Sequence, residues 1–232
     1  GGTAVILHYT GGTWTQVPPP QNGFILRSVF MTDSNNGWAV GDGGSILRYA
    51  GGGWGGFGSP VTNNLRSIFM LSPSDAWAVG DAGTILRYQN GLWIKYGTPT
   101  GAQLNSVFLT SPTNGWVVGT GGTILHFDGT IWLNVPDLVS ADLRSVGQVI
   151  PQEAWAVGVS GTILRWNGIS WYQITPSPPL AGSVDLNSVF LISSGYGLIV
   201  GGSPAPGSQG TVIQLGAGGI NAIPEFNVPM AV

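Results

Sequence analysis

The fold is decided by a stretch, residues 65–93, that reads LRSIFMLSPSDAWAVGDAGTILRYQNGLW. It holds four short apolar runs, and the Pro-Ser and Asn-Gly pairs between them are turn-forming sequences. The runs are rich in Ile, Phe, Tyr and Trp, residues that favour pleated, buried strands. No segment of the chain keeps the 3.6-residue apolar spacing of an amphipathic helix. The stretch therefore predicts four strands, named a, b, c and d below, and almost no helix.

The same four runs recur along the chain, mostly 39 residues apart. The first, Leu-(Arg/Asn)-Ser-(Val/Ile), begins at Leu26, Leu65, Leu104, Leu143 and Leu186. The second, Trp-(Ala/Val)-Val-Gly, begins at Trp38, Trp77, Trp116 and Trp155, and a degraded copy surrounds Leu198. The third contains Ile-Leu at Ile46, Ile85, Ile124 and Ile163. The fourth carries a second tryptophan: Trp14, Trp54, Trp93, Trp132 and Trp171.

Four strands in about 39 residues, repeated in tandem, are typical of the blades of a β-propeller. Each blade packs on a neighbour through both faces, which explains runs that are almost continuously apolar. A leucine-rich horseshoe has a shorter repeat, about 20–29 residues, and β-sandwiches lack sequence identity between units. We therefore predict an all-β protein, a five-bladed β-propeller.

The strand count predicts how such a ring closes. A single domain of residues 1–216 would hold blades at about 18–57, 58–96, 97–135, 136–175 and 176–216, with a tail at 217–232. The fifth unit has runs a, b and c but no d tryptophan, whereas residues 1–17 hold a c-like run and Trp14. We therefore expect residues 1–17 to complete the fifth blade, so that pairing of the two chain ends closes the ring.

Two c-like runs then fit a single c-strand position in the fifth blade, and the run that does not occupy it is a candidate assembly strand. That run lies on the rim, or it adds to a sheet edge in another copy of the protein. A contact of that kind that does not close on itself builds a filament. The candidate assembly residues are Ala4, Val5, Ile6, Leu7, His8, Tyr9, Thr211, Val212, Ile213, Gln214 and Leu215.

Composition excludes several classes of function. Only 7% of the residues are charged, against about 25% in an ordinary domain, and the net charge is −3, so a basic nucleic-acid binder is excluded. The chain has no cysteine, which removes disulfides, thiolate catalysis and cysteine-ligated zinc. No apolar run is long enough to span a bilayer. The sequence predicts no cofactor and no metal.

A candidate ligand site lies at the second position of strand a, the strand that normally lines the central channel of a propeller. The residues are Arg27, Arg66, Asn105, Arg144 and Asn187. Three converging arginines suit a carboxylate or a sulfate. The alternative, which we favour, is that these arginines pair with Asp side chains or carbonyls and are structural. Asp42 and Asp81 are expected to pair with turn amides or with Arg48 and Arg87.

The repeat Gly-Trp-Ala-Val-Gly…Gly-(Thr/Ser)-Ile-Leu…Trp resembles three groups of proteins over about residues 3–215. These are extracytoplasmic propellers related to photosystem II assembly factors, BNR/Asp-box propellers, and Trp-rich repeats of bacterial and archaeal surface proteins. Turns such as Asp128-Gly129-Thr130-Ile131-Trp132 resemble the Asp box without its full spacing. Residues 222–229 resemble the Ile-Pro-Glu-Phe segment before a C-terminal anchor in archaeal surface proteins. The resemblance implies an extracellular or cell-surface protein, trimmed before a membrane anchor.

These observations predict a non-catalytic surface protein. We expect a structural or assembly subunit whose partners are itself or other surface proteins. The alternative is a lectin-like module, because a sugar stacks well on an exposed Trp or Tyr face. Trp166, which stands where other repeats have Tyr or Phe, is the tryptophan outside the repeat pattern. An enzyme is not expected, because the sequence lacks an acid–base pair; Glu153 is the one Glu within the repeats, and it lies in a turn.

Overall fold

The computed structural model describes residues 5–17, 25–176, 180, 184–202, 210–216 and 219–222. These residues form β-strands and three 3-10 turns of three residues each. The chain divides into two compact units, Gly1–Gln103 and Leu104–Val232, and each is described by itself. The helix-poor, all-β prediction is confirmed over the described ranges, where no helix is long and apolar enough to cross a membrane.

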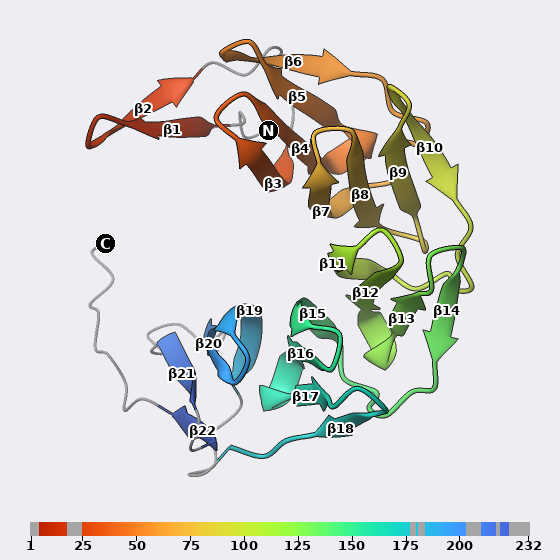
Figure 1. Cartoon of the computed structure of the whole chain (residues 1–232), viewed down its shortest axis with the longest axis vertical. Helices are drawn as coiled ribbons and strands as arrows, with labels where there is room; N and C mark the ends of the chain where they lie inside the picture. The colour runs from red at the N-terminus through yellow and green to blue at the C-terminus, as the bar shows by residue number, and fades with distance from the viewer. Residues whose placement is uncertain are drawn as a thin grey trace. The chain divides into compact units, whose positions relative to one another are not determined.

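The first unit contains three antiparallel sheets, in the order β1-β2, β3-β4-β5-β6 and β7-β8-β9-β10 (Figure 1). Its strands are β1 (Ile6–Thr10), β2 (Thr13–Val17), β3 (Leu26–Asp33), β4 (Asn36–Gly41), β5 (Ile46–Ala50), β6 (Gly53–Phe57), β7 (Leu65–Ser72), β8 (Asp75–Gly80), β9 (Ile85–Gln89) and β10 (Leu92–Tyr96). The 3-10 turn η1 (Asp42–Gly44) connects β4 to β5.

The second unit contains three four-stranded antiparallel sheets, each ordered as in the sequence. Its strands are β11 (Leu104–Ser111), β12 (Asn114–Gly119), β13 (Ile124–Phe127), β14 (Trp132–Val135), β15 (Leu143–Ile150), β16 (Glu153–Gly158), β17 (Ile163–Trp166), β18 (Trp171–Gln173), β19 (Asp185–Ser193), β20 (Tyr196–Gly202), β21 (Gly210–Gly216) and β22 (Gly219–Ala222). The turns η2 (Thr120–Gly122) and η3 (Val159–Gly161) precede β13 and β17. Each predicted run a, b, c or d is one strand, as expected.

The glycine before the c strand is required by a close approach of backbone. Gly44 has φ +74°, and a Cβ added there would lie 2.0 Å from the carbonyl oxygen of Val61. Gly122 has φ +77°, and its Cβ would lie 1.8 Å from the carbonyl oxygen of Val139. Both carbonyls belong to the segment that leads into the next sheet. The Gly-(Thr/Ser)-Ile-Leu motif is therefore a packing requirement between repeats as well as a turn.

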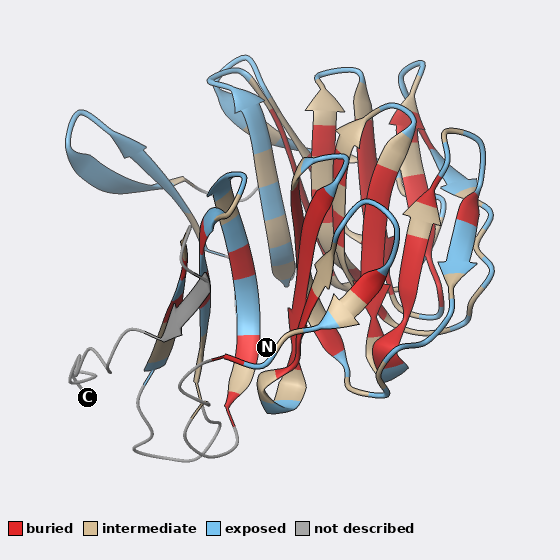
Figure 2. Cartoon of the chain, turned by 60° about the horizontal axis from the view of Figure 1, so that its bottom comes forward, coloured by how far each residue is buried: buried red, intermediate tan, exposed pale blue. Residues whose placement is uncertain are grey.

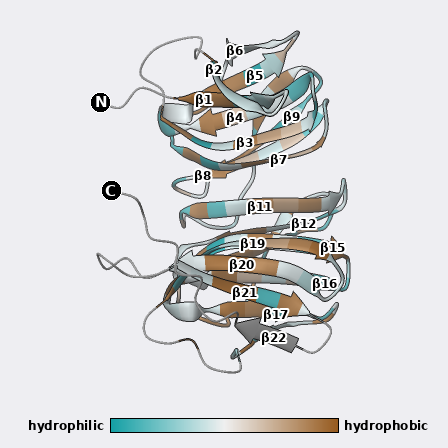
Figure 3. Cartoon of the chain, turned by 90° about the vertical axis from the view of Figure 1, so that its left-hand side faces the viewer, coloured by the Kyte–Doolittle hydropathy of each residue, from teal (hydrophilic) through white to brown (hydrophobic). Residues whose placement is uncertain are grey.

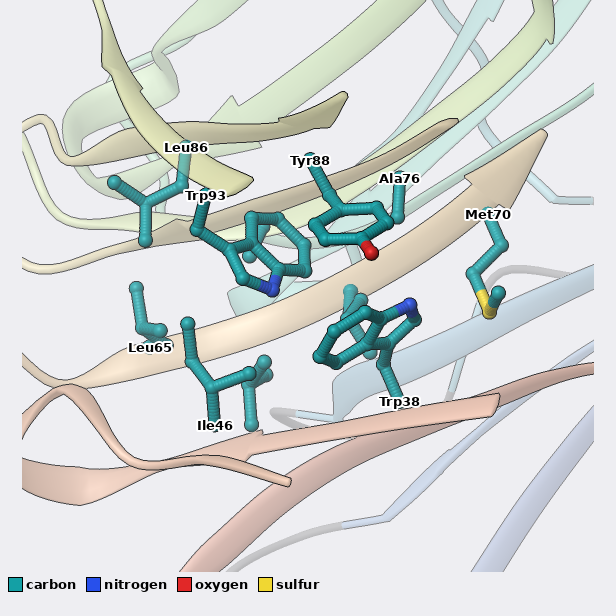
Figure 4. Close-up of a cluster of buried hydrophobic side chains, with 11 residues drawn as sticks. Trp38, Ile46, Leu65, Met70, Ala76, Leu86, Tyr88 and Trp93 are labelled. Atoms are coloured by element: carbon teal, nitrogen blue, oxygen red, sulfur yellow. The ribbon is translucent and has the colours of Figure 1, made fainter. Parts of the chain in front are cut away.

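The b-strand tryptophans fill the core between neighbouring sheets. In the first unit Trp38 is 1% exposed, and its ring lies 4.6 Å from that of Tyr88 and 5.3 Å from that of Trp93 in the following sheet (Figure 4). In the second unit the ring centre of Trp116 lies 5.0 Å from the ring centres of both Trp166 and Trp171. Buried residues accordingly concentrate in the central strands of the sheets (Figure 2). Within each unit, a sheet thus packs its forward face, which carries the b-strand Trp, on the rear face of the sheet that follows it.

The ends of the chain differ from the expectation. We expected residues 1–17 to complete the fifth unit, with Trp14 in the d strand, but β22 occupies the d place beside β21, with Ile220 opposite Leu215. β1 and β2 form a two-stranded sheet of their own. Gly219–Ala222 lacks the tryptophan that marks the other d strands, so no repeat pattern indicates a strand within the predicted tail. Among the described residues, closure of a ring by the chain ends is not shown.

Candidate functional site

In the first unit the candidate arginines of strand a bind aspartates of their own sheets. The Arg27 guanidinium donates to both oxygens of Asp42, and this bond is the main cause that lowers the pKa of the Asp42 carboxyl. Arg66 Nε donates to Asp81 at 2.5 Å. The charge of Arg66 also lowers the pKa of Asp42, and the charge of Asp81 raises the pKa of Arg27. The two pairs therefore form one row of alternating charge across the two sheets.

In the second unit Asn105 and Arg144 bind groups in the sheet that follows their own. Asn105 donates to the carbonyl of Leu143 at 2.8 Å. Arg144 donates to Asp185 at 2.8 Å and also to the side-chain oxygen of Asn187. Arg144 turns to the next sheet because its own b–c turn has Val159 where the first two repeats have aspartate. Each candidate residue thus has a partner, which is the structural arrangement we favoured, and binding of a free anion remains a prediction.

The expected partners of Asp42 and Asp81 were wrong, because c-strand arginines have another role. Arg87 binds Asp75 through two bonds, at 2.9 and 3.1 Å, and lies 4.9 Å from the ring centre of Trp77. Arg48 lies 5.5 Å from the ring centre of Trp38, its cross-strand partner. A guanidinium over an indole face gains cation–π attraction, so these arginines cover the core tryptophans.

Glu153 is a buried carboxylate that joins two sheets of the second unit. It starts β16, is 3% exposed, and accepts bonds from Trp155 Nε1 at 3.1 Å and Arg165 Nη2 at 3.2 Å. From the following sheet, the hydroxyl of Ser194 donates to it at 2.5 Å and the amide of Gly195 at 3.1 Å. Burial acts to raise the pKa of Glu153, but these donors outweigh it and the pKa is lowered. The side chain is an ionised structural link.

A pocket lined by aromatic rings lies between two sheets of the second unit. Its volume is about 360 Å³, and its lining includes Trp116, His126, Trp166, Ile169 and Trp171. The ring of His126 stacks on Trp116 at 4.4 Å, and its Nε2 lies 2.9 Å from the side-chain oxygen of Asn114. Burial lowers the pKa of His126, which keeps the imidazole neutral near pH 7. The pocket offers a flat apolar wall with few polar groups.

A serine in strand a connects neighbouring sheets, and sequence reasoning missed it. The amide of Ile68 donates to Ser28 Oγ, that of Val146 to Ser106 Oγ, and that of Val189 to Ser145 Oγ, each at 3.2 Å. The signal was present, because the third position of every strand a is serine. We call these contacts serine links. Each points in one direction along the chain, from the amide of one sheet to the hydroxyl of the sheet before it.

The polar residue before strand a makes a second connection. Asn64 accepts a bond from the amide of Gly43 at 2.9 Å, Asp142 from Gly121 at 2.8 Å, and Asp185 from Ser160 at 3.1 Å. Each side chain thus caps the b–c turn of the preceding sheet. The first repeat departs from this pattern, since Ile25 stands in this position and is 51% exposed. An aligned column of polar residues would have revealed the contact.

The two predicted assembly strands differ in how they pair with other strands. Thr211, Val212, Ile213, Gln214 and Leu215 lie in β21, paired on both sides by β20 and β22. Val5, Ile6, Leu7, His8 and Tyr9 lie in or beside β1, which is paired only with β2 in the part of the chain that the structure describes. Ala4 lies outside the described residues, as do residues 223–229 of the anchor-like segment. The surplus is therefore a hairpin, β1–β2.

A cavity of about 580 Å³ lies between this hairpin and the β3–β6 sheet. Its lining includes Val5, Ile6, Val29, Tyr49 and Trp54. We call it the hairpin cavity. It opens on the rear face of the β3–β6 sheet. In the next sheet, β7–β10, the equivalent face is covered by Trp38 and its neighbours.

The last sheet exposes its forward face. Phe190 in β19 is 68% exposed and Ile192 is 69% exposed, whereas Phe30 and Phe69, which occupy the Phe190 position in their repeats, stack on each other at 4.8 Å. Leu198 and Val200 of β20 are also exposed, and part of β20 is coloured as strongly hydrophobic (Figure 3). Large apolar side chains exposed together on one sheet commonly mark a protein interface.

Comparison with known proteins identifies the fold and not a family. No protein-family model and no curated protein matches the chain. A structure described as YCF48 bound to D1 peptide is similar at 20% identity and a TM-score of 0.69, over 92% of this chain and 71% of that one. YCF48 from Cyanidioschyzon merolae is 19% identical, with a TM-score of 0.63 over 88% of this chain and 70% of that one. The WD40 propeller domain of Doa1 is 14% identical, with a TM-score of 0.70 over 98% and 76%.

The chain therefore has the fold of a β-propeller protein, as the repeat predicted. At such low identity the likeness extends to fold alone. The Asp-box group finds no support among these matches, because no sequence family is matched. The YCF48 matches support the propeller fold that the sequence resemblance implies.

Proposed function

We propose that the chain is a non-catalytic propeller that works as an assembly subunit and binds other polypeptides through its terminal sheets. In this proposal the five four-stranded sheets are five blades, and β1–β2 is part of a further one. The observation that carries it is the apolar surface at both ends of the repeat array: the Phe190–Ile192 face and the hairpin cavity. The paired state of Arg27, Arg66 and Arg144 supports a structural rather than a catalytic use of the charged residues.

Two further facts support an interaction role. β1 presents an unpaired edge, within the described residues, that is suited to main-chain pairing with another strand. One of the similar structures carries a bound peptide according to its description. Self-association by strand addition into filaments is part of the proposal.

Light scattering at increasing protein concentration, followed by negative-stain microscopy, tests it. The intact chain should associate with itself, and a double variant Phe190→Lys with Ile192→Lys should weaken this association about tenfold or more, because two charges would be buried at the contact. The matched control changes Leu92 and Ile131 to Lys, since both are exposed but lie away from the last sheet, Leu92 in β10 and Ile131 in the turn before β14. A chain that stays monomeric at all concentrations, or a control that acts like the test variant, would contradict self-assembly.

The location proposed is extracellular or on the cell surface. It is supported by the resemblance of the repeats to surface propellers and by the near absence of lysine, since Lys95 is the single one in the chain. Fractionation of the source cells with an antibody against the chain tests it. Recovery in the soluble cell interior would overturn it.

A lectin-like function is a second candidate because the aromatic pocket beside Trp166 offers a stacking wall. A glycan array tests it with two proteins, the intact chain and Trp166→Ala. Binding that the variant loses would favour a lectin. An array without signal from the intact chain would count against it.

A further inference from the structure

We propose that the aromatic pocket between the β11–β14 and β15–β18 sheets binds a cationic side chain, the guanidinium of an arginine that a partner polypeptide presents. The pocket has a volume of about 360 Å³, and Trp116, His126, Trp166 and Trp171 line it. The inference rests on the proposed function, because it names the side chain by which a bound polypeptide would be recognised.

Three other repeats place an arginine over the tryptophan of their b strand. The guanidinium carbon lies 4.9–5.5 Å from the ring centre in the pairs Arg48–Trp38, Arg87–Trp77 and Arg165–Trp155. The negative face of an indole ring attracts a cation at this distance. The surroundings of a b-strand tryptophan in this fold are therefore a favourable place for a guanidinium.

The first repeat shows that the guanidinium also reaches the following sheet. Nη1 of Arg48 donates a long hydrogen bond, 3.4 Å, to the hydroxyl of Tyr88. The ring centres of Trp38 and Tyr88 are 4.6 Å apart (Figure 4). The cation of this repeat is thus held beside two aromatic side chains that belong to neighbouring sheets.

The third repeat has the two aromatic positions but not the arginine. Trp116 and Trp166 stand at these positions, with ring centres 5.0 Å apart. His126 replaces the arginine, and its ring stacks on Trp116 while its Nε2 lies 2.9 Å from the side-chain oxygen of Asn114. The imidazole is shorter than an arginine side chain, and burial lowers its pKa, which keeps it uncharged near pH 7. The aromatic surroundings are therefore kept without a permanent charge on the c strand.

The charges close to the pocket are negative. No arginine or lysine is present in the lining over the residues that the structure describes. The charge of Asp128 acts on the ring of His126, so this carboxylate lies near the pocket. Asp137 is exposed and stands in the chain between Pro136 and Leu138, which both line the pocket. These carboxylates attract a cation that enters and repel an anion.

The lining favours arginine over a metal ion or lysine. A metal ion such as calcium needs several oxygen ligands, and this lining consists mainly of rings and aliphatic side chains. A guanidinium is planar and weakly hydrated and stacks on aromatic faces, whereas the lysine ammonium is compact and strongly hydrated. Leu138 and Ile169 are exposed at the pocket and offer apolar surface to the methylene groups of the arginine.

Two peptides titrated into the full 232-residue chain test the inference. The first is acetyl-Gly-Gly-Arg-Gly-Gly-amide, and the second has citrulline, the uncharged isostere of arginine, in the central place. Tryptophan fluorescence and NMR of the indole N–H groups measure binding. We expect the arginine peptide to bind at least about tenfold more tightly than the citrulline peptide, because cation–π attraction requires the charge.

His126→Arg is the most informative variant, because it gives the third repeat the arginine of the others. Its own guanidinium should occupy the place beside Trp116 and weaken peptide binding about tenfold or more, without a fall in Tm. Leu92→Arg is the matched control: it adds the same charge at an exposed position of β10, outside the pocket, and should keep binding. Trp166→Leu removes one ring and should also weaken binding. If Trp166→Leu does not fold, His126→Arg still tests the inference.

Equal binding of the two peptides, no binding of the arginine peptide at about 10 mM, or full binding by His126→Arg would overturn the inference. A neutral sugar that binds this pocket when the arginine peptide does not would also overturn it and favour the lectin. Self-association without binding of the arginine peptide refutes this inference alone. Binding of the arginine peptide by a strictly monomeric chain refutes self-assembly alone.

Discussion

At the scale of single residues, the structure assigns most charged side chains to holding neighbouring strands and sheets together. Among the described residues most of the few charged side chains bind a specific partner, and Glu153 binds the most groups. It is buried and joins β16 and β17 to the Ser194–Gly195 turn of the next sheet. A buried carboxylate with donors on all sides is stable in the charged form, and losing that charge leaves the donors poorly matched.

Glu153→Gln is expected to lower the free energy of unfolding by about 1–3 kcal/mol, because charge-assisted bonds become neutral and one acceptor becomes a donor. Urea unfolding followed by tryptophan fluorescence measures it. Asp128→Asn is the control and should be nearly neutral: Asn167 makes the same turn contacts, at 2.9 and 3.0 Å, in the next repeat. Equal losses in both variants would contradict the role of Glu153.

The lowered pKa of Glu153 also predicts a pH dependence. The stabilisation is fully present above the ordinary carboxyl pKa of 4.5 and is lost as the pH falls through the lower pKa of the folded state. The difference in Tm between the intact chain and Glu153→Gln should therefore shrink between about pH 7 and about pH 3. Calorimetry at stepwise pH measures it. A difference that grows on acidification would reverse the sign.

At the scale of the strand and turn, the repeat made nearly every element predictable. Strands a, b and c of each unit follow directly from the alternation of apolar runs and turn pairs, because the same packing recurs every 39 residues. Strand β22 was not predicted because it has no tryptophan. The ion pairs were not predicted either. Asp42 was expected to bind Arg48, but strand pairing places Arg48 over the ring of Trp38, and Asp42 binds Arg27 instead.

The b–c turn offers a prediction with an internal control. Gly122→Ala should cost about 2 kcal/mol or more, because its Cβ would overlap the Val139 carbonyl. Gly121→Ala should cost only about 1 kcal/mol: nothing lies within 4 Å of its Cβ, and Ser160 adopts the same positive φ, +54°, in the next repeat. Thermal unfolding of both variants measures the difference. Equal costs would show that the conformation alone, and not the contact, requires Gly122.

At the scale of the whole molecule, low charge and exposed apolar faces act together. A net charge of −3 over 232 residues provides little repulsion between copies, while the Phe190–Ile192 face favours contact. A propeller meant to stay single would be expected to carry more charge on its surface. The composition therefore agrees with an assembly role better than with an isolated binding module.

Self-association driven by apolar surface should respond to salts in a characteristic way. Raising sodium chloride from about 0.1 M to about 1 M should not weaken it, since few charges are involved, and ammonium sulfate should strengthen it. Sedimentation velocity measures both effects. Dissociation by sodium chloride would point to the arginine and aspartate rows as the contact instead.

The serine links have a consequence for the geometry of any such assembly. Each sheet offers a hydroxyl forward and an amide backward, so a stack of sheets has two unlike ends. Two copies that meet through these ends must do so in the same sense and cannot be related by a two-fold axis. A polymer built in this way would have a polarity. Its two ends would be chemically distinct, and subunits would add to them at different rates.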